Sequence, residues 1–136
     1  MGQQQLLLLV LGTVIVALAV VVGLDAFQKN RTQMNEDALV DTALRLGSEV
    51  QAWATKPGLY GGINDWSNID GSTFDFASIG LESGQEYEND VGTFTVSGGA
   101  AEVIITGENE DTEKIIKVIV TGPSSTDIDV EVEYGS

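Results

Sequence analysis

The sequence predicts an α+β protein in which one long N-terminal helix packs on a small antiparallel β-sheet. Three observations lead to this prediction. The first 24 residues carry no charged side chain and include a run of 19 residues that are almost all aliphatic. Apolar residues then recur at helical spacing as far as residue 53. After residue 91, apolar and polar side chains alternate with the period of β-strands.

The first predicted segment, residues 1–27, is an apolar helix. Its run from Leu6 to Leu24 would be about 28 Å long at roughly 1.5 Å per residue, which matches the hydrocarbon thickness of a bilayer. Thr13 alone interrupts the apolar surface, so the polar face of an ordinary soluble helix is missing. We expect a retained membrane-length helix. A cleaved signal sequence, which usually has a basic start, and a buried helix of a soluble protein are the alternatives.

The second segment, residues 28–57, continues the helix with an amphipathic pattern. The polar stretch 28–37 contains neither Gly nor Pro and so nothing that forces the helix to end. After it, apolar residues recur at spacings of three and four and predict one face that packs on the head: Leu39, Ala43, Leu46, Val50 and Trp53. Lys56, Pro57 and Gly58 form a stop signal, so one helix is predicted from Gln3 to about Thr55.

The third segment, residues 58–136, is predicted to be a β-rich head. Residues 60–76 are rich in Gly, Asn, Asp and Ser and indicate loops and turns. Four strands follow, at 92–98, 101–107, 113–122 and 127–134, with a hairpin formed by the second and third. In the last strand, Ile128, Val130, Val132 and Tyr134 share one face. Acidic residues occupy the other face, as expected for a sheet with one face in water.

Charge is distributed very unevenly along the chain. The net charge is −15, and residues 65–136 carry sixteen acidic and two basic residues, a net of −14. Phosphate binding requires basic groups, so such a head is not expected to bind nucleic acid. The chain also contains no histidine and no cysteine, the residues that most often serve as general base, thiolate nucleophile or transition-metal ligand. We therefore expect a protein that is not an enzyme and needs no cofactor.

Two acidic clusters are candidates for calcium, which prefers several oxygen ligands. In the first cluster, Asn68 and Asp70 fit positions of an EF-hand loop and Asp75 follows nearby, but Trp66 occupies the first ligand position and cannot ligate. The second cluster is the turn that contains Glu108, Glu110, Asp111 and Glu113. Acidic residues in turns and on the outer side of strands are normally solvated, so an acidic surface without a metal is the preferred interpretation.

Two tryptophans, Trp53 and Trp66, flank the predicted junction between helix and head. Packing in the core or at this junction is the favoured interpretation of both. Contact with a neighbouring subunit is the alternative, because tryptophan is common at protein interfaces.

An uncharged helix of membrane length that continues as an amphipathic helix under a small β-sheet head resembles the type IV pilin superfamily. The Gly2–Gln3 junction is similar to the site at which prepilins are processed, although no basic residue precedes it. Members of the superfamily usually carry glutamate five residues into the mature chain, whereas this chain has Gln5 or Leu7 there, depending on where the mature chain starts. The disulfide-closed loop of many bacterial pilins is absent, because the chain has no cysteine.

The resemblance implies a structural subunit of an extracellular helical filament. Its partners would be further copies of itself, the inner membrane before assembly, and the pilus assembly machinery. Small residues allow helices to approach closely, so the helix in the filament core is expected to use Leu6, Leu9, Gly12, Val16, Ala19 and Gly23. Two other functions stay open: a pseudopilin of a type II secretion system, and a single-pass membrane protein whose acidic head binds a ligand.

Overall fold

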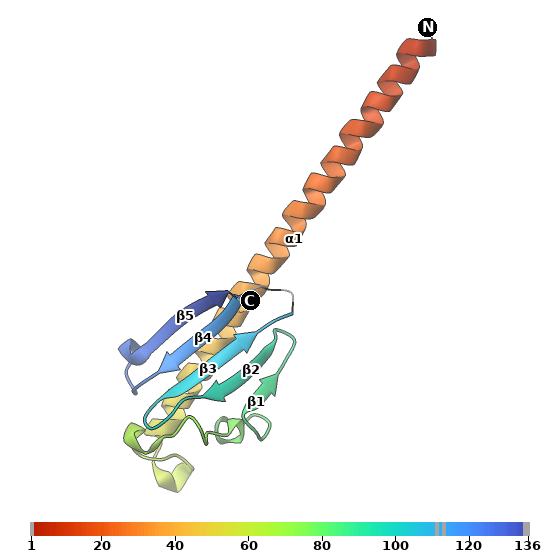
Figure 1. Ribbon diagram of the computed structural model, residues 1–136. Coiled ribbons are helices and arrows are strands. Elements are labelled where there is room, and N and C mark those ends of the chain that lie inside the picture. The colour runs from red at the N-terminus through yellow and green to blue at the C-terminus, as the bar shows by residue number, and fades with distance from the viewer. Residues whose placement is uncertain (1, 111, 113, 135–136) are drawn as a thin grey trace. The chain divides into compact units, whose positions relative to one another are not determined.

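The computed structural model describes residues 2–110, 112 and 114–134, and it confirms the predicted α+β class (Figure 1). One helix, α1, runs from Gly2 to Thr55 and ends directly before the predicted stop signal. Five strands follow: β1 (Glu86–Glu88), β2 (Thr93–Ser97), β3 (Val103–Glu108), β4 (Lys114–Val120) and β5 (Ile128–Tyr134). The chain forms two compact units, one up to Met34 and one from Asn35 onward.

The strands form one antiparallel sheet in the order β1-β2-β3-β4-β5, so each strand pairs with its neighbour in sequence. The predicted hairpin is confirmed: β3 pairs with β4, with Val103 opposite Val120. Strand β1 was not predicted. It has only three residues, two of them glutamates, and such a segment is too short to show an alternating pattern.

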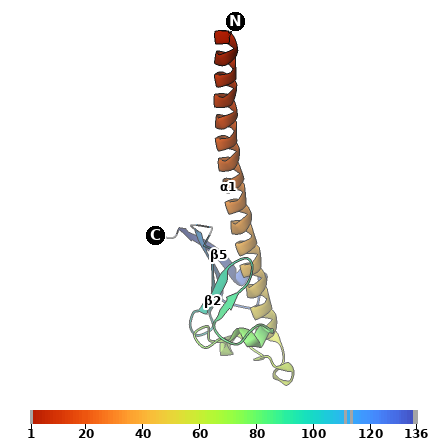
Figure 2. The same cartoon turned by 90° about the vertical axis from the view of Figure 1, so that its right-hand side faces the viewer.

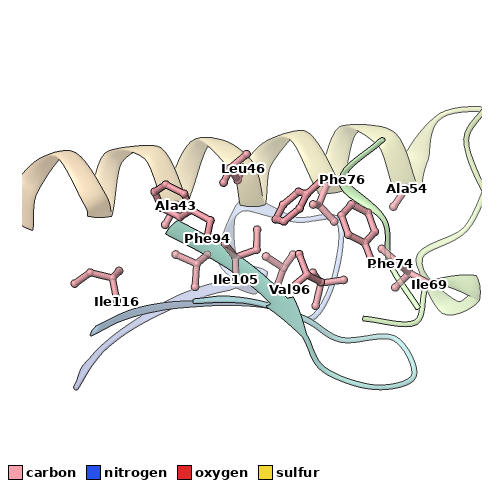
Figure 3. Close-up of a cluster of buried hydrophobic side chains, with 14 of the residues drawn as sticks. Ala43, Leu46, Ala54, Ile69, Phe74, Phe76, Phe94, Val96, Ile105 and Ile116 are labelled. Carbon is pink, nitrogen blue, oxygen red and sulfur yellow. The ribbon is translucent and has the colours of Figure 1, made fainter. Parts of the chain in front are cut away.

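The core of the unit from Asn35 onward lies where α1 packs on one face of the sheet (Figures 2 and 3). Leu39, Leu46 and Val50 on α1 are completely buried. The opposing layer consists of strand and loop side chains that are also buried: Phe74, Phe76, Phe94, Val96, Val103, Ile105, Ile116, Val118 and Val120. A run of edge-to-face and tilted aromatic contacts joins Phe74, Phe76 and Tyr87 within this layer.

Two glycines leave room for neighbouring core side chains, one where α1 packs on the sheet and one between two strands. A Cβ atom at Gly47 of α1 would lie 3.2 Å from Cγ1 of Val118 and 3.3 Å from Cγ2 of Val120, both on β4. A Cβ atom at Gly107 of β3 would lie 2.9 Å from the ring of Phe94. Interiors are close-packed, so these contacts leave little room for a side chain at either position.

One expectation about β5 is wrong. The alternating pattern predicted one covered face, yet Val130, Val132 and Tyr134 are all exposed, as are the acidic residues on the other face. The register explains why: these side chains share a face with the buried Ile116 and Val118 of β4, but β5 is the edge strand of the sheet. Only Ile128, at the start of β5, is packed against the core.

Candidate functional site

The apolar segment of α1 exposes large aliphatic side chains along its whole length. Its leucine, isoleucine and valine side chains between Leu6 and Leu24 are each 50–69 % exposed. The most apolar 18-residue window of α1 has a mean hydropathy of 3.0, and none of it is buried. The helix is therefore long and apolar enough to cross a membrane, a property that it shares with signal sequences.

The residues predicted to contact other helices form one face of this segment. Leu9, Gly12, Val16, Ala19 and Gly23 recur at spacings of three and four along the continuous helix, and Leu6 precedes them by one further turn. All six are exposed. Nothing lies within 4 Å of the positions that a Cβ atom would occupy at Gly12 and Gly23. The face is therefore open, with small residues between larger ones.

The polar groups of this helical segment are satisfied locally. The hydroxyl of Thr13 donates to the carbonyl oxygen of Val10 at 2.7 Å, so it needs no partner from water or from another chain. The first charged residues follow Leu24, where Lys29 forms an ion pair with Asp25 at 3.2 Å. The predicted processing residues Gly2 and Gln3 lie in the first turn of α1.

The predicted head-packing face lies against the sheet. Leu39, Ala43, Leu46 and Val50 are fully buried, whereas Trp53 is half-buried. The Trp53 ring meets Phe74 edge-on at 5.4 Å, and its indole N–H donates to the carbonyl oxygen of Gly61 at 2.9 Å. Sequence reasoning missed three further buried residues of this face: Thr42 and Gly47, which give no apolar signal, and Ala54, which follows the last residue of the predicted pattern.

The second tryptophan, Trp66, is also part of the head. Its side chain is buried, and its indole N–H donates to the carbonyl oxygen of Ala101 at 2.8 Å. This contact links the loop after α1 to the connection between β2 and β3.

The two carboxylates of the first calcium candidate, Asp70 and Asp75, stabilise turns. Asp70 accepts hydrogen bonds from the hydroxyl of Ser72 at 2.6 Å and from its backbone N–H at 2.9 Å, and these bonds lower the pKa of Asp70. Asp75 accepts from the backbone N–H groups of Ala77 at 2.9 Å and Gly84 at 2.7 Å, which lower its pKa. Bonds to the charged form of a carboxylate favour that form.

The third residue of that calcium candidate, Asn68, donates from its side-chain amide to the carbonyl oxygen of Ile63 at 3.3 Å. In the second acidic cluster, Glu108 and Glu110 border a shallow hollow with Glu88 and Asp90, while Asp111 and Glu113 lie outside the described residues. Within the described part of the chain, no three His, Cys, Asp or Glu residues are placed to hold a metal ion.

One ion pair joins the sheet to α1 within the unit from Asn35 onward. Nζ of Lys114 lies 2.8 Å from Oε2 of Glu36 and 5.7 Å from the ring centroid of Tyr134. The hydrogen bond to Glu36 raises the pKa of Lys114, partly offset by desolvation. No sequence signal could have identified this pair, because 77 residues separate its members.

A second exposed apolar feature is the loop that follows α1. Leu59 is 97 % exposed and Tyr60 lies beside it, although the loop itself is well hydrogen-bonded. Oδ1 of Asn64 accepts from the backbone N–H of Gly58 at 2.6 Å, and the backbone N–H of Tyr60 donates to Pro57 at 2.9 Å. The loop therefore presents these side chains on an ordered turn.

Comparisons of the chain with known protein families, with curated proteins and with solved structures find no match. The α+β arrangement, one long apolar N-terminal helix with a small antiparallel sheet, is compatible with a pilin-like fold.

Proposed function

We propose that this chain is a non-enzymatic structural subunit of a type IV pilus-like helical filament outside the cell. Copies would wait in the membrane, held there by the apolar segment of α1, until an assembly machinery adds them to the growing filament. In the filament, the apolar segments would form the core and the acidic heads would face water. The partners of each subunit are then further copies of itself, the membrane and the assembly machinery.

The exposed apolar segment is the observation that carries the proposal. The unit from Asn35 onward has a core of its own, made of α1, the sheet and the loops, and the segment from Leu6 to Leu24 contributes nothing to that core. Covering one leucine, isoleucine or valine side chain is worth about 1.5–3 kcal/mol, so the fourteen such residues of this segment need lipid or other apolar helices around them.

The open face of α1 supports a role for this helix in filament assembly as well as in membrane attachment. A helix can leave the bilayer only for another apolar environment, and a bundle of identical helices provides one. Gly12, Ala19 and Gly23 allow the backbones of two helices to approach closely. An interface between two different patches, repeated by a rotation and a translation, produces an open helical fibre. The net charge of −14 on residues 65–136 would keep separate fibres soluble.

Electron microscopy of material sheared from native cells tests the proposal. Filaments that contain this chain, identified by mass spectrometry and by labelling with an antibody to the head, are the expected result. N-terminal sequencing of the same material would show whether the mature chain starts at Gln3. Material that contains only monomers or detergent micelles under native shearing conditions would overturn the proposal.

A single-pass membrane protein with a ligand-binding head is the second candidate, favoured by the same membrane-length helix. Calorimetric titration of the full chain in detergent with calcium tests its most specific form. Micromolar binding with measurable heat would favour this candidate, whereas the filament proposal expects no heat. A short periplasmic pseudopilus instead of a surface fibre is distinguished by the location of the filaments in thin sections of cells.

A further inference from the structure

Two large apolar side chains lie on α1 beyond its apolar run. Phe27 and Met34 are 61 % and 65 % exposed, although the residues between them are mostly polar. Seven residues are two helical turns, so both side chains lie on one face, about 10.5 Å apart along the axis. Val16 and Gly23 precede Phe27 on the same face at helical spacing. The face that is open in the apolar run therefore continues into the charged part of the helix.

A second uncovered apolar strip lies on β5. Val130, Val132 and Tyr134 point to the same side of this strand and are 41 %, 48 % and 75 % exposed. Alternate residues of a strand are about 6.6–6.8 Å apart, so the strip is about 13 Å long. Among the described residues, no strand lies beyond β5 to protect it. The β5 strip and the Phe27–Met34 face are thus two apolar surfaces of similar length.

Charge favours a helix of a second copy over a second β5 strand as the partner of the β5 strip. Asp129, Glu131 and Glu133 project from the other face of β5, so pairing two copies of this strand would bring acidic rows together. The helix from residue 25 to residue 34 instead has one acidic and two basic residues. Arg31 lies one turn after Phe27 and is exposed. This segment of a second copy therefore offers apolar contact together with a net charge opposite to the −14 of residues 65–136.

We propose that, in the assembled filament, the Phe27–Met34 face of one copy packs on the β5 strip of a second copy. The inference rests on the proposed function, because it names the head surface that a neighbouring helix contacts. One helix on one strand buries less than the roughly 1,200–2,000 Å² of a stable separate interface. The contact therefore forms together with the packing of the apolar segments, and it fixes where a neighbouring helix lies against the head.

Cysteine cross-linking between two differently tagged full-length copies tests the interface, because the natural chain contains no cysteine. One copy carries Phe27→Cys or Met34→Cys, and the other carries Val130→Cys or Val132→Cys. The copies are produced together in the native cells, and sheared filaments are oxidised. A disulfide requires Cα atoms within about 4.4–6.8 Å. We expect a heterodimer carrying both tags for at least one of these four pairs.

Matched control variants place the cysteine on the other side of the same element. Lys29→Cys on α1 and Glu131→Cys on β5 are expected to give about tenfold less heterodimer, since disulfide geometry is specific. Filaments that form but give no more heterodimer than these controls would overturn the interface and leave the proposed function intact. Efficient dimers of Val132→Cys with itself would show that β5 pairs with β5, which also overturns it. Absence of filaments from the unsubstituted chain would overturn the proposed function itself.

Discussion

The two halves of α1 are both rich in apolar residues, yet they differ completely in burial. Between Leu6 and Leu24 every leucine, isoleucine and valine side chain is at least half exposed, whereas Leu39, Leu46 and Val50 have no exposed surface at all. The sequence difference between the halves is periodicity. The first half is apolar all round, and the second is apolar on one face only.

The chain covers the apolar face of the second half of α1 with its own sheet, but it covers none of the first half. A helix with one apolar face needs a single partner, and here the sheet of the same chain supplies it. A helix that is apolar on every side needs to be surrounded, by lipid or by several other helices. Substitutions in the two halves should therefore affect different properties: the stability of the head in one case, and membrane association and assembly in the other.

The largest effect is expected when the same substitution is made in both halves. Leu46→Ala leaves a cavity in the core and should lower the free energy of unfolding of the head by about 2–5 kcal/mol. Leu9→Ala should leave it unchanged, because Leu9 contributes nothing to that core. Thermal unfolding in detergent, followed by tryptophan fluorescence, measures both variants. Trp53 and Trp66 are the only tryptophans, so the signal reports on the head. Equal destabilisation by the two variants would break the comparison.

A charge in the apolar segment should have the next largest effect. Val16→Arg lies near the middle of the run and should disfavour its insertion by about 2.5–3.5 kcal/mol, roughly a hundredfold. The proposed filaments should be lost as well, since the charge would lie among apolar helices. Membrane fractionation and electron microscopy measure these results. The control is Arg45→Val, which removes an exposed charge from the other half. Normal filaments from Val16→Arg would contradict the proposed packing.

A smaller effect is expected from filling the space at two glycines. Gly47→Leu places a side chain where Val118 and Val120 already lie and should destabilise the head by about 1–3 kcal/mol. Gly23→Leu meets nothing within 4 Å and should not affect unfolding of the head, although it should reduce the yield of the proposed filaments. If Gly47→Leu leaves the unfolding temperature unchanged, helix and sheet are farther apart than the structure indicates.

The sequence was sufficient to predict the α+β class, the end of α1 and the β3–β4 hairpin, because each depends on a local pattern. Periodicity of three and four marks the helix, Lys56–Pro57–Gly58 ends it, and alternation marks the strands. These signals depend only on nearby residues. They correctly describe elements whose partners are adjacent in sequence.

The features that the sequence could not predict depend on contacts or backbone conformations that no local pattern contains. Alternation in β5 predicts one covered face, but an edge strand can keep the pattern of a covered strand while nothing lies over it. Likewise, the ion pair of Glu36 with Lys114 and the close approach at Gly47 arise from contacts between distant segments. The sequence makes Asp70 and Asp75 calcium candidates, whereas in the structure both accept hydrogen bonds within tight turns. That role depends on the backbone conformation of the loop, which the sequence pattern does not contain.

The smallest effect is expected from acidification, which should change the stability of the head but not the membrane association of residues 1–24. Residues 1–24 carry no titratable side chain, so membrane association of α1 should not change between pH 7 and pH 3. In the head, backbone hydrogen bonds lower the pKa of Asp75, so its contribution to stability is fully present above the unfolded pKa of about 3.9. That contribution is lost as the pH falls through the folded value. Loss of this contribution should lower the unfolding temperature of the head between pH 5 and pH 2.

Asp75→Asn tests the origin of that decline. Its amide oxygen can still accept hydrogen bonds from Ala77 and Gly84, but it no longer titrates, so the variant should lose less stability between pH 5 and pH 2 than the unsubstituted chain. Glu82→Gln is the matched control, because Glu82 is exposed and should leave the decline unchanged. Protonation of other carboxylates relieves repulsion in both variants equally, so only the difference between them measures Asp75. If the two variants decline alike, the acid sensitivity of the head arises elsewhere than at Asp75.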